Sequence, residues 1–154
     1  MRRDRIANEK VIDFFPPAAK GSGIPYYSSI FDTQRLCAGQ NNREVCTNIL
    51  IVFSIASGWS AGGLLDAKLQ CSNSSLASTQ FDYAIISQMG GAESEDLYLA
   101  EIKNFNRYIR LVATPLVANV TLCAIGIANR SRREPVCQEG REKAVRYAAN
   151  PTMD

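Results

Sequence analysis

The sequence predicts an all-β protein, built as a single antiparallel β-sandwich of the jelly-roll type. Seven or eight short segments alternate apolar with polar residues and are rich in β-branched and aromatic side chains, which is typical of half-buried strands. Clusters of Gly, Ser, Asn and Pro separate these segments, as turns require. Before residue 138 no segment repeats its apolar residues with the helical period of 3.6. Many short strands joined by turns indicate a sandwich or a jelly roll.

The densest runs of β-formers are residues 108–112 and 119–127. We expect Pro115 to break the chain between them, because proline has no N–H to give to a strand ladder. Residues 43–54 become apolar on both faces toward their end, which predicts a central strand buried on both sides. The other expected strands cover residues 64–71, 80–86 and 97–102, and 29–34 lead into the domain.

Residues 1–28 are predicted to form an extended N-terminal arm, and the sandwich is expected to span residues 29–130. Prolines and glycines punctuate the arm, so no long regular element is expected there. Its large apolar residues either pack back on the domain or anchor a neighbouring molecule. The anchor interpretation is favoured, and it assigns partner contact to Phe14, Phe15, Tyr26 and Tyr27.

Both ends of the chain are basic although the net charge is only +2. Residues 1–20 hold five Lys/Arg against three acids, and residues 129–147 hold six against three. Such ends suit docking on an acidic surface, and solvated ends are an equal alternative. The excess is too small for the basic stripe of a nucleic-acid-binding protein. We expect Arg2, Arg3 and Arg5 to meet an acidic partner surface.

Residues 131–154 are predicted to form a short C-terminal tail. Residues 139–149 contain good helix formers and are expected to make a short helical turn, which Pro151 stops.

In the loop before residue 64, Trp59 either contacts a partner or plugs the end of the core, and these alternatives are equally supported.

Composition argues against an enzyme and against a cofactor or metal site. The chain has no histidine, and its acidic residues Glu93, Glu95 and Asp96 sit in a Gly-rich loop where solvation explains them. The five cysteines are odd in number and lack CxxC spacing, so we expect reduced thiols in a cytosolic chain, with Cys46 and Cys123 as small core residues. The longest apolar run has five residues, far below the ~20 of a membrane span. We expect a soluble protein with no signal peptide.

Several segments together resemble the capsid cement (decoration) proteins of tailed bacteriophages, of the jelly-roll type known from a Bordetella phage. The resemblance covers about residues 28–133. It is carried by the strand LDAKLQCSN at 65–73, the strand RYIRL at 107–111 and the final alternating strand at 120–127. The opening SIFDTQ at 29–34, Phe81 and the strand at 97–102 also fit the family pattern.

The resemblance implies a homotrimer on the outside of an icosahedral head, where it ties neighbouring major capsid proteins together. Its location would be the outer capsid surface of the virion, after synthesis in the host cytoplasm. The long N-terminal arm departs from the family and would reach an adjacent subunit. Deleting residues 1–28 is then expected to leave a folded sandwich that binds heads poorly.

Two other functions fit the same strands. The segments LQCSN and RYIRL also resemble strands of discoidin-like sandwiches, which bind carbohydrates or surfaces. Such modules are usually secreted and disulfide-linked, and the odd cysteine count argues against this alternative. A third possibility is another small capsid or tail subunit with the same sandwich.

Overall fold

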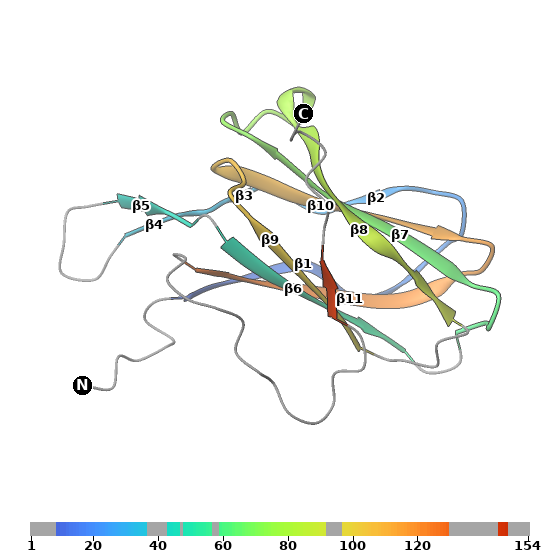
Figure 1. The fold of residues 1–154 in the computed structure, drawn as a ribbon. Coiled ribbons are helices and arrows are strands. Elements are labelled where there is room, and N and C mark those ends of the chain that lie inside the picture. Colours follow the sequence, from blue (N-terminus) through green and yellow to red (C-terminus); the bar gives the residue numbers. More distant parts are fainter. Residues whose placement is uncertain are drawn as a thin grey trace, which may run out of the picture.

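Two mainly antiparallel sheets packed face to face make up the body of the protein (Figure 1). The computed structural model describes residues 9–36, 43–46, 48–56, 59–91, 97–129 and 145–147. Within these residues there is no α-helix, and the all-β sandwich predicted from the sequence is confirmed. No helix in the described part is long and apolar enough to cross a membrane.

The first sheet has the strand order β1-β11-β6-β9-β12, and the second has the order β2-β10-β7-β8, with β3 also paired to β10. The strands of the first sheet are β1 (Glu9–Lys20), β6 (Asn48–Ile55), β9 (Leu97–Lys103), β11 (Val120–Asn129) and β12 (Val145–Tyr147). Those of the second are β2 (Tyr26–Tyr27), β3 (Phe31–Asp32), β7 (Leu64–Ser72), β8 (Phe81–Gly90) and β10 (Tyr108–Leu116). A one-turn 3-10 helix, η1 (Ala77–Thr79), lies between β7 and β8.

The pairing order is that of a jelly roll. The first strand β1 pairs with β11, β2 pairs with β10, and β6 pairs with β9. The strands in the middle of this sequence order, β7 and β8, pair with each other. Each of these pairs is antiparallel, so the chain behaves as one long hairpin rolled up into two sheets. A separate hairpin, β4 (Gln34–Leu36) with β5 (Arg43–Val45), projects away from the body between β3 and β6 (Figure 1).

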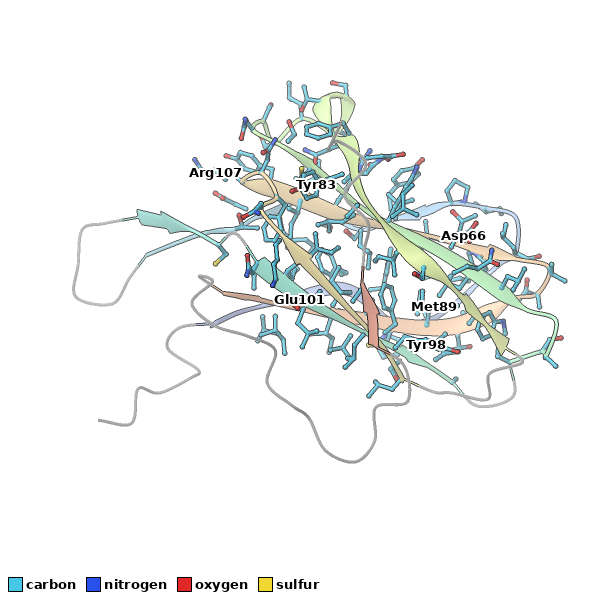
Figure 2. The ribbon with its side chains drawn as sticks, viewed as in Figure 1. Asp66, Tyr83, Met89, Tyr98, Glu101 and Arg107 are labelled. Atoms are coloured by element: carbon cyan, nitrogen blue, oxygen red, sulfur yellow. The ribbon has the colours of Figure 1, made fainter. Side chains whose placement is uncertain are left out.

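The core lies between the sheets and follows the period of two along each strand. Residues of β6 with odd numbers point inward and are buried, whereas Leu50 and Val52 face outward. Met89 and Tyr98 are among the most buried side chains of the core (Figure 2). The Tyr98 hydroxyl donates a hydrogen bond to the Gly90 carbonyl at 3.1 Å, so its polar end is satisfied.

The predicted N-terminal arm is wrong for residues 9–27, because residues 9–20 form β1 at the edge of the first sheet. Phe14 and Phe15 are both buried in the core, where the Phe14 ring meets Phe31 edge-on at 5.5 Å between centroids. Two register shifts relative to β11, flanking Phe15, let consecutive phenylalanines turn inward. Deletion of residues 1–28 would therefore remove a core strand, which contradicts the expectation of a folded truncated sandwich.

Prolines did not break the strands where the sequence suggested. Pro16 and Pro17 lie within β1, whose outer side pairs with no described strand, so an absent N–H is tolerated there. Pro115 lies within β10, and its carbonyl accepts a hydrogen bond from the Gly23 amide at 2.7 Å. The nitrogen of a strand residue points to the same side as its carbonyl, so the absent N–H of Pro115 faces the 21–25 loop and no bond to β7 is lost.

The C-terminal prediction is also partly wrong, since residues 145–147 form the strand β12 and not a helical turn. This strand pairs in parallel with Leu99–Glu101 on the outer edge of β9. The edge of β9 offers unpaired backbone groups, and the Val-Arg-Tyr sequence suits a strand. The sandwich thus includes residues beyond the predicted 29–130 at both ends, and the rest of the predicted tail lies outside the described residues.

The burial of Phe14 generates a prediction about stability. Phe14→Ala should lower the free energy of unfolding by about 3–5 kcal/mol, because it opens a cavity in a packed core. Val11→Ala, on the outward face of the same strand, is the matched control and should cost less than about 1 kcal/mol. Urea denaturation followed by tryptophan fluorescence measures both. Equal and small losses for the two variants would contradict the burial of β1.

Candidate binding surface

Two of the strands that carry the resemblance, β7 and β10, are hydrogen-bonded neighbours in the second sheet. Their register places Arg110 opposite Gln70, and both side chains lie on the outer face. Arg110 Nε donates a hydrogen bond to Gln70 Oε1 at 2.6 Å, and Gln70 Nε2 donates to Asp82 Oδ1 at 2.5 Å. Lys68 Nζ donates to the other oxygen of Asp82 at 2.7 Å. We call these four residues the polar network; it connects β10, β7 and β8.

The polar network fixes the charge state of Asp82. Partial burial opposes ionisation of this carboxyl, but the hydrogen bonds from Lys68 and Gln70 and the positive charges of Lys68 and Arg110 outweigh it. The pKa of Asp82 is therefore lowered from its ordinary value. The pair of Lys68 and Asp82 is well exposed, so it positions side chains more than it stabilises the fold.

Tyr27 stands at the β2 side of this face and is 55% exposed. The guanidinium carbon of Arg110 lies 4.8 Å from the centre of the Tyr27 ring, a cation–π contact that fixes both side chains. Tyrosine and arginine are among the residue types enriched in the energetically dominant part of protein interfaces. Tyr27 therefore stays a candidate for partner contact, and its contact with Arg110 adds that residue as a second candidate.

An open depression of about 640 Å³ lies on the same face. Val112, opposite Tyr27 on β2 and Lys68 on β7, lines it although its side chain is almost fully covered. Ile85 borders it as an exposed apolar residue, and its polar lining includes Asp66, which accepts a hydrogen bond from Gln88 at 2.7 Å (Figure 2). The depression thus combines an apolar floor with polar side chains, as surfaces that hold a partner or ligand do.

A second fixed cation flanks the face beyond the end of β9. Arg107 donates two hydrogen bonds to the Asp32 carboxylate, from Nε at 2.8 Å and from Nη2 at 2.7 Å (Figure 2). Its guanidinium carbon also lies 5.0 Å from the centre of the Tyr108 ring. The hydrogen bonding to Asp32 raises the pKa of Arg107 above its ordinary value. This bidentate geometry orients the start of β10 against β3.

The structure distributes the other predicted contact residues differently. Phe14 and Phe15 are core residues, and their assignment to a partner is wrong. Tyr26 is half-buried against the core, and its hydroxyl accepts a hydrogen bond from the Gly21 amide at 2.7 Å. Arg2, Arg3 and Arg5 lie outside the described residues.

Trp59 is half-buried and packs against the core, which agrees with the plug alternative. A side chain at Gly63 would collide with its indole ring, so glycine is required for this approach.

Among the cysteines, Cys46 and Cys71 are buried, and burial raises the pKa of the Cys71 thiol. Cys123 is only half-buried, on the outward side of β11, so the core placement predicted for it is not met.

The polar network was missed by sequence reasoning, although part of its signal was present. The alternation in residues 64–71 places Lys68 and Gln70 on one face, and the alternation in 108–112 places Arg110 on another. These two faces form one surface only because the strands that carry Gln70 and Arg110, 40 residues apart in the sequence, pair with each other. The alternation of apolar and polar residues does not specify which strands pair.

Within the described part of the chain, no group of three or more His, Cys, Asp or Glu side chains is arranged to hold a metal ion. No protein-family model matches the chain, and no curated protein matches its sequence. What this protein does is therefore inferred from its own fold and surface chemistry.

The lowered pKa of Asp82 predicts a pH-dependent contribution to stability. The folded pKa lies below the unfolded value of about 3.9, so the contribution is complete above that pH and is lost as the pH falls through the folded pKa. Wild type should therefore lose about 0.5 kcal/mol more unfolding free energy than Asp82→Asn between pH 6 and pH 2.5, a small amount because the pair is exposed. Urea denaturation over this pH range measures the difference, and Lys68→Met should reduce it. Identical pH profiles for wild type and Asp82→Asn would contradict the network.

Proposed function

We propose that this protein is a capsid cement protein of a tailed bacteriophage. It is a non-enzymatic structural protein that binds the outer surface of the phage head between major capsid proteins and stabilises the shell. The observation that carries the proposal is the pairing of the segments LQCSN at 69–73 and RYIRL at 107–111. Two of the sequence segments that resemble the family are adjacent strands of a jelly roll, and a hydrogen bond between Arg110 and Gln70 joins them.

The surface chemistry supports adhesion as the activity. The outer face of the second sheet presents Tyr27 with Arg110 held against its ring, beside an open depression with an apolar floor. Hydrogen bonds hold the side chains of the polar network, and Arg110 holds the Tyr27 ring, before any partner arrives, so binding costs these residues little side-chain entropy. We assign this face to the major capsid protein, with a homotrimer as the bound form.

Stabilisation of the shell follows from mass action. A ligand that binds only the expanded head shifts the equilibrium toward that state, by an amount set by its concentration relative to Kd. Three copies of the binding face in one trimer multiply weak individual contacts, because the second and third contacts form within one complex. Moderate affinity per face is then enough for firm attachment.

The exposed Tyr27 ring beside the depression also supports a second candidate, a carbohydrate-binding module. Sugars bind proteins by stacking their apolar face on an aromatic ring while neighbouring polar side chains bond the hydroxyls. This candidate predicts a monomer that binds selected glycans on an array and has no affinity for phage heads.

The proposal predicts binding to heads made of the major capsid protein encoded with this chain. The purified protein should form a trimer in solution, by light scattering coupled to size exclusion. It should co-sediment with expanded heads and raise the temperature at which they break. Arg110→Ala should weaken head binding by about tenfold, a loss of about 1.4 kcal/mol, because it removes an arginine anchor. Ser54→Ala, at an exposed residue on the outward side of β6 in the other sheet, is the control and should bind as wild type does.

A protein that stays monomeric and does not co-sediment with heads would contradict the cement proposal. If it then bound glycans, the second candidate would be supported instead. Head binding that is unchanged in Arg110→Ala would retain the cement function but remove this face as the attachment surface.

A further inference from the structure

The connection between β10 and β11 contains a strained valine. Val117 has a φ of 70°, in the left-handed region that β-branched residues rarely adopt. The Ala118 amide donates a hydrogen bond to the Leu116 carbonyl at 2.8 Å, which closes a γ-turn around Val117. Such a conformation costs folding free energy for any residue with a branched Cβ.

Elsewhere the chain places suitable residues at positive φ. Gly23 has a φ of 76°, and Asn104, a type that tolerates this region, has a φ of 59°. At residue 117, packing of the side chain does not offset the free-energy cost of this backbone conformation, because the Val117 side chain is 76% exposed. Backbone strain that no internal contact explains is typical of functional positions.

A second exposed aliphatic residue lies in the adjoining loop. Ile24, between β1 and β2, is 56% exposed. Two hydrogen bonds hold its loop in place. The Ser22 amide donates to Asn119 Oδ1 in the β10–β11 connection at 2.9 Å, and the Gly23 amide donates to the Pro115 carbonyl near the end of β10 at 2.7 Å. The two loops therefore form one fixed structure, and we call Ile24 and Val117 the apolar tip.

The two loops are also uncharged. Residues 21–25 and 117–119 contain no Asp, Glu, Lys or Arg, in a chain where these types make up 21% of the residues. The nearest cation in sequence, Lys20, is turned back over the rings of Phe15 and Tyr26, at 5.4 and 5.0 Å from their centres. The apolar tip thus has the chemistry of an insert for an uncharged pocket.

We propose that the apolar tip inserts into an apolar socket on a protein subunit of the shell, as a contact separate from the Tyr27 face. This inference rests on the proposed cement function and adds a second attachment point to it. A protein socket fits better than a lipid surface, because binding to membranes by exposed apolar residues is usually aided by neighbouring Lys and Arg, which these loops lack. A strained, rigid insert also loses little conformational entropy when it docks.

The test uses Val117→Gly in the full chain, with binding to expanded heads and urea denaturation measured together. Glycine accepts the positive φ without a Cβ, so the unfolding equilibrium constant should fall by about threefold or more. Removal of the side chain should at the same time weaken head binding by at least about tenfold. A variant that is more stable yet binds more weakly distinguishes a docking residue from a structural one. Ile24→Ser, at an ordinary backbone position, should weaken binding without any gain in stability.

Leu76→Gly is the matched control. Leu76 is 61% exposed at the opposite end of the sandwich, at an ordinary φ of −75°, so glycine there should lower stability slightly and leave head binding unchanged. If Val117→Gly and Ile24→Ser bind heads within twofold of wild type, docking by the apolar tip is contradicted, while the cement function stands. Absence of head binding by the wild-type chain would overturn both. Binding of the wild type to phosphatidylcholine vesicles that Val117→Gly abolishes, with head affinity unchanged, would assign the tip to membranes and also overturn the proposal.

Discussion

Pairing between the first strand and the last long strand is the constraint on which the rest of the structure depends. β1 bonds to β11 from Glu9 opposite Asn129 to Lys20 opposite Val120, which closes one side of the first sheet. Phe14 and Phe15 turn inward from β1 and fill the core beneath β11, and a side chain at Gly126 would collide with the Phe14 ring. The glycine and the bulged strand therefore fit each other, and the sandwich is complete only with its N-terminal segment in place.

Closure of the roll also determines which surfaces remain for a partner. The edge strand β1 carries two prolines and shifts its register twice against β11, and β8, at the edge of the other sheet, shifts its register twice against β7. Both features discourage another strand from adding to these edges. The contacts that we propose therefore use side chains, in two places on the described part of the chain. One is the Tyr27 face with its polar network, and the other is the apolar tip.

Strands with regular alternation could be predicted from the sequence, and strands with special positions could not. Residues 64–71 and 97–102 show uninterrupted patterns, and β7 and β9 begin where those patterns begin. β1 was missed because Pro16 and Pro17 are acceptable only on an edge strand, and edge position is a property of the whole sheet. Pro115 was misjudged for the same reason, since the side to which its nitrogen points depends on the neighbouring loop. The candidate binding face required the register of β7 against β10, which no local pattern contains.

Amide hydrogen exchange of β1 in the full-length protein tests the closed roll most directly. The β1 amides that bond to β11 should exchange only through global unfolding, with the same opening free energy as the central strands β6 and β11. Rapid exchange throughout residues 9–20, with β6 and β11 still protected, would show that this segment is an arm after all and would contradict the account.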